Sequence, residues 1–217
     1  MGWTCNPEKQ DVLRDNFLDC LTTIWDGKGK VLDIGTGRGW VAVEIAKRFH
    51  EAQVIGLDIW PKFWSLWGQT KEGAEENARI ANVTERCAFQ YGNALDSPFK
   101  DGEFQLVVST FAFHEIHVPD RTILLKELVR VLAPGGTFVV CDLFPRGYRV
   151  KNVPELLEKI EQLGIEEVKH KTLKEAGVDL GGFYHIWGIA YLSARKIRIS
   201  PSQKIFHCKN EDFDNLH

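Results

Sequence analysis

The sequence has few of the features that mark secreted, membrane-spanning or metal-binding proteins. Its 217 residues include five cysteines, an odd number, with no C-x-x-C pair and no His/Cys cluster at metal-ligand spacing. No apolar run reaches the roughly 18 residues that a membrane-spanning helix needs. The first residues, MGWTCNPEKQD, lack the apolar core of a signal peptide. We therefore expect a cytoplasmic protein with no metal site.

A surplus of basic residues is also missing. The chain has 27 Lys and Arg against 30 Asp and Glu, a net charge of −3, and its basic residues are scattered. Proteins that bind nucleic acid usually carry a basic face, so nucleic acid is not an expected partner. The sequence shows no internal repeat and no Pro/Gly/Ser-rich linker. It predicts one domain over residues 1–199, a polar tail over 200–217, and a monomer or homodimer.

Strand-like apolar runs alternate with segments of helical periodicity. The predicted helices cover residues 7–25, 40–50, 70–81, 122–132 and 153–163. The predicted strands cover 30–34, 53–57, 88–91, 105–109, 137–142, 167–172 and 186–195. This alternation, with inner strands apolar on both faces, is typical of a parallel sheet covered on both sides. Because no helix separates the last two strands, they predict an antiparallel hairpin at one edge. The fold class is α/β, a doubly wound seven-stranded sheet.

Three glycines follow the first predicted strand, in the stretch VLDIGTGRGW. Gly35, Gly37 and Gly39 lie where a strand turns into a helix, and side-chain-free positions there let a ligand approach the backbone. A dinucleotide site would have the spacing G-x-G-x-x-G, but here Trp40 takes the place of the third glycine. The Lys-Ser/Thr pair of a P-loop is also missing. The turn therefore predicts a ligand site that is not built for a phosphate.

From Val31 to Lys196 the order of motifs resembles the class I S-adenosylmethionine-dependent methyltransferases, which have a Rossmann-like sheet. VLDIGTGRG resembles the family's first motif, whose loop wraps the amino acid part of the cofactor, and Asp33 matches the acid that helps hold its ammonium group. VIGLD ends in Asp58, like the family's acid that accepts both ribose hydroxyls. Two carboxylate oxygens suit a vicinal diol.

The stretch YGNALDSPF resembles the family's third and fourth motifs. Asn93 stands where Asp is common, and its amide oxygen can accept from the adenine amino group; Ala94 matches a position whose backbone meets the adenine ring. The resemblance implies S-adenosylmethionine as cofactor and S-adenosylhomocysteine as product. The implied cofactor contacts are Asp33, Gly35, Thr36, Gly37, Gly39, Asp58, Ile59, Trp60, Asn93, Ala94 and Ser109.

Several extra residues, rich in tryptophan, separate Asp58 from the next helix, where the resemblance resumes near Thr70. Ile59 or Trp60 is placed to cover the adenine face. Three interpretations of Trp64 and Trp67 stay open: packing of the insertion onto the domain, a wall of the acceptor pocket, or a dimer or membrane-surface contact.

The segment after the fourth strand, STFAFHEIHVPDR, bears on the chemistry. It lacks the Asn-Pro-Pro-Tyr/Phe of enzymes that methylate exocyclic base amines or glutamine, and it resembles the small-molecule, quinone-biosynthesis-like branch. His114 is the candidate base or acceptor-orienting residue, and Glu115 is a candidate for setting its tautomer. The alternative is a histidine that caps or packs a helix start.

The predicted edge hairpin brings a second set of candidate acceptor contacts. Its connection, GGFYHIW, would place Tyr184 and His185 near the acceptor, opposite Trp64. This nearly uncharged, aromatic rim favours an apolar or aromatic acceptor.

These patterns predict methyl transfer to oxygen, carbon or sulfur of a small molecule. Three alternatives remain: a methyltransferase acting on protein or nucleic acid, a nicotinamide oxidoreductase, and a protein that binds S-adenosylmethionine without turnover.

Overall fold

The computed structural model describes residues 7–118, 120, 122–144, 153–180 and 188–198. Its helices and short 3-10 helices are α1 (Pro7–Ile24), α2 (Trp40–Arg48), η1 (Lys62–Trp67), α3 (Lys71–Ile80), η2 (Phe113–Glu115), α4 (Thr122–Val131) and α5 (Val153–Glu161). Its strands are β1 (Lys28–Ile34), β2 (Glu51–Asp58), β3 (Cys87–Tyr91), β4 (Phe104–Thr110), β5 (Leu132–Leu143), β6 (Ile165–Thr172) and β7 (Ile189–Lys196).

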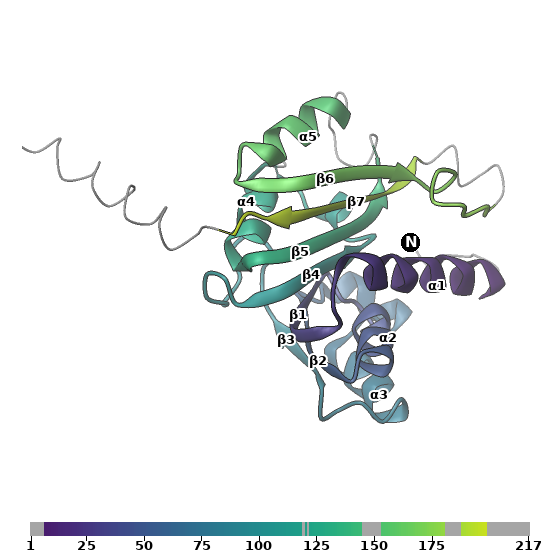
Figure 1. The fold of residues 1–217 in the computed structure, drawn as a ribbon. Coiled ribbons are helices and arrows are strands. Elements are labelled where there is room, and N and C mark those ends of the chain that lie inside the picture. The colour runs from purple at the N-terminus through teal and green to yellow at the C-terminus, as the bar shows by residue number, and fades with distance from the viewer. Residues whose placement is uncertain (1–6, 119, 121, 145–152, 181–187, 199–217) are drawn as a thin grey trace, which may run out of the picture.

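All seven strands join one sheet in the order β3-β2-β1-β4-β5-β7-β6. The first five in this list pair in parallel, whereas β7 runs antiparallel to both β5 and β6. The predicted edge hairpin is therefore confirmed, and β7 lies between β5 and the edge strand β6 (Figure 1). Its connecting residues 181–187 lie outside the described part of the chain, as does the tail from 199 onward.

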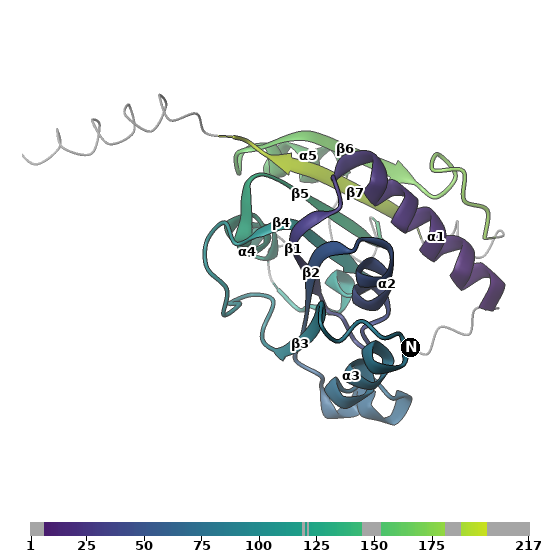
Figure 2. The same ribbon diagram turned by 60° about the horizontal axis from the view of Figure 1, so that its bottom comes forward.

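Helices cover both faces of the sheet, as the two apolar faces of the inner strands require. On one face α1, α2 and α3 pack on residues such as Val31 and Leu106. On the other, α4 and α5 pack on residues such as Leu32 and Val107. The alternation of Val31 with Leu32 between the two clusters follows the two-residue period of a strand. Figure 2 shows α1 beside α2 on the first face.

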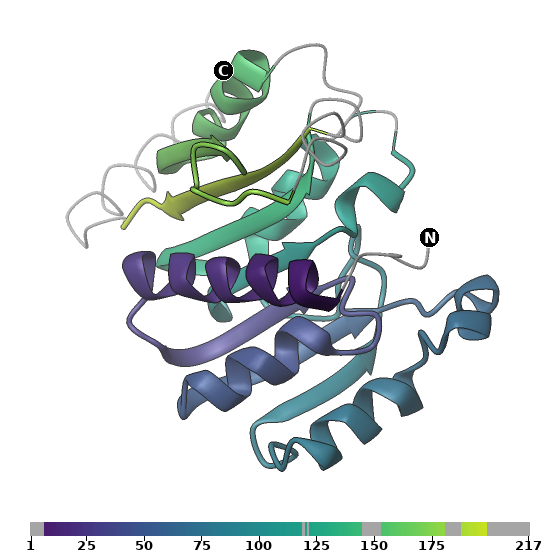
Figure 3. The same cartoon turned by 90° about the vertical axis from the view of Figure 1, so that its right-hand side faces the viewer.

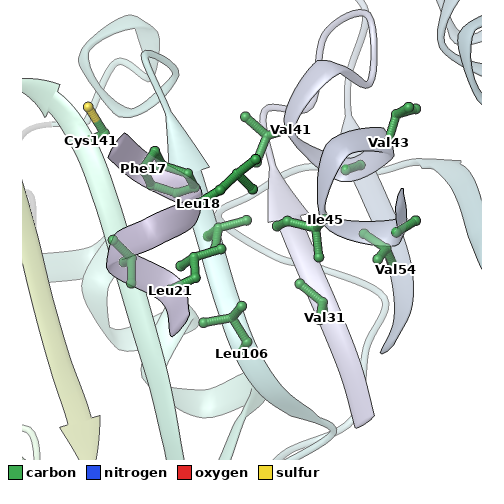
Figure 4. Packing of buried hydrophobic residues seen from close by; sticks show 14 of the residues in the cluster. Phe17, Leu18, Leu21, Val31, Val41, Val43, Ile45, Val54, Leu106 and Cys141 are labelled. Carbon is green, nitrogen blue, oxygen red and sulfur yellow. The ribbon is translucent and has the colours of Figure 1, made fainter. Parts of the chain in front are cut away.

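Side chains from α1 and α2 meet over the middle of the sheet. Phe17 and Leu21 of α1 and Ile45 of α2 are buried and turn toward Val31 and Leu106, as Figure 4 shows. This packing holds α1 across the sheet, so that Leu13 near its N-terminal end reaches the edge where the parallel strands end.

The start of the fifth strand differs from the sequence prediction. The predicted strand begins at residue 137, but β5 begins at Leu132, directly after α4, and includes the turn-forming residues Pro134, Gly135 and Gly136. The pairing of β4 with β5 shifts register between Phe104 and Leu106. This irregularity accommodates the turn residues within the strand, since a bulge absorbs extra residues on one side of a pair.

Candidate functional site

A cleft of about 1300 Å³ opens at the carboxyl ends of the parallel strands. Ligands of open α/β sheets bind at this edge, near the point where the strand order reverses, here between β1 and β4. This volume exceeds the roughly 300–1,000 Å³ of a pocket for one small ligand. Its lining includes Leu13, Gly35, Thr36, Gly37, Arg38, Trp40, Val41, Asp58, Ile59, Trp60, Trp64, Trp67, Asn93, Ala94, Phe111, Ala112, His114, Glu115, Ile116, Leu143 and Ile189.

The glycine turn is held close to the strands by backbone hydrogen bonds. The N–H of Gly35 donates to the carbonyl of Leu57 at 2.8 Å. Gly35 has a φ of 71°, and a Cβ there would come within 2.1 Å of the Cβ of Ala112. A side chain at this position would therefore strain the backbone and collide with the segment that follows β4. The turn's shape depends on glycine here.

Asp33 lies beneath the turn, almost fully buried. Its Oδ2 accepts a hydrogen bond from the Thr36 hydroxyl at 2.7 Å. Burial raises the pKa of the Asp33 carboxyl to about 7, the Thr36 hydrogen bond opposes this rise, and the charge of Asp58 adds to it. A buried carboxyl that ionises near neutrality is ready to pair with a cationic ligand group, because the added charge favours its ionised form.

Asp58 ends β2 with both carboxylate oxygens already oriented by the backbone. Its Oδ2 accepts from the N–H of Gly37 at 2.9 Å, and its Oδ1 from the N–H of Trp60 at 2.7 Å. A carboxylate has about four lone-pair sites, so each oxygen keeps capacity for one further donor. Two such acceptors on one rigid group fit the two hydroxyls of a ribose.

Ile59, Asn93 and Ala94 line the neighbouring part of the cleft. The Asn93 Oδ1 accepts from the N–H of Leu95 at 3.0 Å, which fixes the loop after β3. That oxygen retains one lone pair for an external donor. Ile59 is exposed, so an apolar face is available to a flat ring.

His114 lies in the cleft wall on η2 and is held by a residue far along the chain. Its Nδ1 is 2.7 Å from Oδ1 of Asp142, at the end of β5, and its backbone N–H donates to Oδ2 at 3.2 Å. Asp142 is fully buried. The His114 Nε2 is 3.1 Å from Oε1 of Glu115.

Two carboxylates around one imidazole change its protonation. Burial disfavours the charged ring of His114, but the hydrogen bond and charge of Asp142, together with Glu115, outweigh burial and raise the pKa of His114. The ring can donate a hydrogen bond to both carboxylates only when both of its nitrogens carry protons. Glu115, the candidate for setting the tautomer of His114, lies beside Nε2, whereas Asp142, beside Nδ1, was not predicted. An acid at the carboxyl end of a buried strand, beside the strand that precedes His114, is the signal that could have identified it.

Most of the site residues expected from sequence meet in the cleft, and three do not line it. Asp33 lies below the glycine turn. Gly39 is buried, and a Cβ on it would come within 2.5 Å of the Phe89 ring, so it serves packing of α2. Ser109 is buried, and its hydroxyl donates to the carbonyl of Ile34 at 2.8 Å. Tyr184 and His185 lie outside the described residues.

Trp64 and Trp67 both line the cleft, and no η1 residue is buried. This position fits a wall of the acceptor pocket, and it leaves packing of the insertion onto the domain and a dimer or membrane-surface contact open. Within the described part of the chain, no group of three or more His, Cys, Asp or Glu side chains could hold a metal ion. None of the described helices is both long and apolar enough to cross a bilayer.

Comparison with known proteins agrees with this geometry. Residues 31–136 match the family model described as a methyltransferase domain. This match covers just under half of the chain and agrees with the resemblance to the class I S-adenosylmethionine-dependent methyltransferases. The glycine turn and Asp58 both lie within the matched residues. The match therefore supports S-adenosylmethionine as the cofactor.

The names of similar curated proteins describe enzymes that act on small molecules. Tocopherol O-methyltransferase of Arabidopsis thaliana is 38% identical over 111 residues, covering 51% of this chain and 29% of the relative. A ubiquinone/menaquinone biosynthesis C-methyltransferase of Geobacter sulfurreducens is 33% identical over 142 residues, covering 64% of this chain and 51% of the relative. The matched stretch thus spans about half, or less, of the length of these relatives.

Solved structures share the fold of the methyltransferase domain at low identity. Geranyl diphosphate C-methyltransferase from Streptomyces coelicolor has a TM-score of 0.64 at 16% identity, covering 84% of this chain and 76% of that one. A SAM-dependent methyltransferase from Aquifex aeolicus has a TM-score of 0.63 at 19% identity, covering 88% of this chain and 94% of that one. These likenesses support the Rossmann-like architecture.

Proposed function

We propose that this protein transfers a methyl group from S-adenosylmethionine to a small apolar acceptor, with His114 as the base. The observation that carries the proposal is the placement of His114, oriented by buried Asp142, in the wall of the cleft that contains the glycine turn and Asp58. The bound cofactor supplies an electrophilic methyl group on a sulfonium centre. The protein has to bind both molecules, exclude water and handle a proton.

Three parts of the site bind the cofactor in this proposal. The glycine turn receives the amino acid part, with Asp33 beneath it as counter-charge to the ammonium group. Asp58 accepts the ribose hydroxyls on its two free lone pairs. Ile59 and the loop at Asn93 and Ala94 border the adenine ring.

His114 takes the proton that a hydroxyl or thiol acceptor loses as it attacks the methyl group. With Nδ1–H directed at Asp142, the Nε2 atom of the neutral ring is the basic nitrogen. Glu115, beside Nε2 and partly exposed, is placed to pass that proton to solvent. The acceptor gains a methyl group and gives up one proton, and S-adenosylhomocysteine leaves.

The chemistry of the cleft beside His114 supports an apolar acceptor. Phe111 and Ile116 come from the same segment as His114, while Leu143 follows Asp142 directly. Leu143 pairs with Ile189 across β5 and β7, and both line the cleft. Apolar walls beside His114 and Glu115 are suited to hold an acceptor such as a phenol or a similar ring alcohol.

A labelled-methyl screen tests this proposal. Cell metabolite extracts incubated with the protein and methyl-labelled S-adenosylmethionine should yield one or more labelled small products. Asp58→Ala should abolish cofactor binding in calorimetry, and His114→Ala should remove labelling while S-adenosylhomocysteine still binds. The exposed His50, outside the cleft, provides a matched control as His50→Ala. Label appearing only in protein or nucleic acid, or cofactor binding with no labelled product, would refute the proposal.

A further inference from the structure

The short helix η1 carries apolar side chains that the cleft does not use. In a 3-10 helix, residues three apart lie in one row. Trp64 and Trp67 form the row that lines the cleft. Phe63 and Leu66 form the neighbouring row and are 64% and 80% exposed. Two large apolar side chains in one row on the surface mark an interaction site rather than scattered surface residues.

This segment is ordered by its own contacts. Gly68 ends it with a φ of 70°, and its N–H donates to the carbonyl of Ser65. The Ser65 hydroxyl donates to the carbonyl of Lys62 at 2.6 Å. The Phe63 ring packs on the Trp67 ring with centroids 5.1 Å apart. In Figure 3 the segment, in blue, stands out at the rim of the domain. It presents a preformed apolar surface.

Two positive charges without a carboxylate partner among the described residues, Lys62 and Arg38, lie at this surface. From residue 59 to 70 the one charged side chain is Lys62. The Arg38 guanidinium carbon lies 3.8 Å from where a Cβ on Gly68 would stand. Within the described residues, no carboxylate pairs with the side chain of Lys62 or Arg38. An apolar row bordered by free cations is complementary to a surface that is apolar inside and anionic outside.

We propose that η1 and Arg38 dock on a lipid bilayer with anionic headgroups, Phe63 and Leu66 entering the boundary between headgroups and acyl chains. Aromatic and leucine side chains favour that boundary, and Lys62 reaches back to the headgroups. A second copy of the chain fits less well, because a two-fold contact across this surface would bring the same cations together. Docking also places Trp64 and Trp67, which line the cleft, next to the lipid. Entry of a lipid-soluble acceptor by this route rests on the proposed function; docking itself does not.

Vesicle flotation with the full chain tests the docking. We expect the protein to float with vesicles of phosphatidylcholine and phosphatidylglycerol in equal parts, more weakly with phosphatidylcholine alone, and less as salt rises. The double variant Phe63→Ser/Leu66→Ser should lower the partition coefficient at least about tenfold, because two apolar side chains no longer leave water. Lys62→Gln should weaken binding to the anionic vesicles only.

Ile80→Ser is the matched control. Ile80 is 69% exposed at the C-terminal end of α3, away from η1, and its loss should leave flotation unchanged. Calorimetry with S-adenosylhomocysteine shows that each variant is folded. No flotation of the wild-type protein, or equal flotation of the double variant, overturns the proposal. So does a dimer in light scattering that the double variant dissociates. Because no acceptor is needed, these outcomes are independent of whether methyl transfer is demonstrated.

Discussion

The indole Nε1 of Trp60 donates a hydrogen bond to the carbonyl oxygen of Gly37 at 2.7 Å. Asp58, two residues earlier, accepts from the N–H of the same glycine. The end of β2 thus holds both polar groups of the central glycine of the turn. Trp60 has a φ of 35°, unfavourable for a side chain of this size. The buried ring, edge-on to Tyr91 at 4.8 Å, offsets that strain.

Trp60→Phe should weaken cofactor binding while keeping the ring packing. The variant leaves the Gly37 carbonyl without its indole donor, so Gly37 loses one of the two hydrogen bonds that join it to the end of β2. Loss of one hydrogen bond costs about 1 kcal/mol, which corresponds to an about fivefold rise in the Kd for S-adenosylhomocysteine by calorimetry. Trp25→Phe, whose Nε1 donates to the Lys28 carbonyl, should leave that Kd unchanged. Equal affinity of the Trp60 variant and the wild type would show that the turn needs no such support.

His114→Ala should reduce kcat by about 100-fold or more, the usual contribution of a positioned base. Because Asp142 raises the pKa of His114 above its ordinary value of 6.5, the neutral base forms only at higher pH. Activity should therefore rise with pH through a midpoint above 6.5.

Asp142→Asn should move that midpoint to lower pH, because the charge that stabilises the imidazolium is gone. It should also lower the plateau rate, since the ring is less well oriented. The pH–rate profile separates this positioning role from a loss of folding, which would lower the rate equally at all pH values. An unshifted midpoint would count against the link between the two residues.

Asp33→Asn should stabilise the ligand-free protein while weakening cofactor binding. The folded-state pKa of Asp33 is raised to about 7, above the ordinary 3.8. Its contribution to stability is therefore full below about 3.8 and is lost as pH rises toward about 7. The asparagine variant avoids this loss, so its melting temperature should exceed that of the wild type at alkaline pH and approach it in acid. A constant difference at every pH would exclude ionisation of Asp33 as the cause.

Glu127 should make the fold sensitive to acid. Its carboxylate accepts from the Ser97 N–H and hydroxyl and pairs with Arg130, which also donates to the Phe99 carbonyl. The Arg130 hydrogen bonds, followed by those of Ser97, lower the pKa of Glu127 to about 2. The stabilisation is present above the ordinary 4.5 and is lost as pH falls toward about 2.

Urea unfolding of Glu127→Gln measures this contribution. The variant should lose about 2 kcal/mol at neutral pH, after allowance for the partly exposed Arg130. The difference from wild type should shrink as the pH is lowered. Glu158→Gln, an exposed change on α5, should have little effect at any pH. A difference that persists in acid would indicate lost packing instead of lost charge.

Several parts of the molecule could be predicted because they depend on local pattern. The glycine turn at Gly35 needs a backbone that other residues cannot adopt, so the sequence carries its signature. The apolar strands and periodic helices likewise follow from which faces must be buried. The antiparallel edge hairpin follows from two strands with no helix between them. Asp58 could be placed because it ends a strand recognisable by its hydrophobicity.

Other parts depend on contacts between residues far apart in the chain. The hydrogen bond between His114 and Asp142 joins η2 to the end of β5 across 28 residues of chain, and only the pairing of β4 with β5 brings them together. Ser109 was expected at the cofactor and is buried instead, because the alternation of side chains along β4 turns its hydroxyl to Ile34.

By itself the sequence determined the order of elements, the glycine turn and the acid that ends β2, since each is fixed by the conformational limits and burial pattern of a few neighbouring residues. Only the tertiary structure decided which side chains share the cleft. It also decided that Trp60 folds inward while Phe63 and Leu66 stay in water. Those outcomes depend on how strands pair and how a short helix turns, which no local pattern specifies.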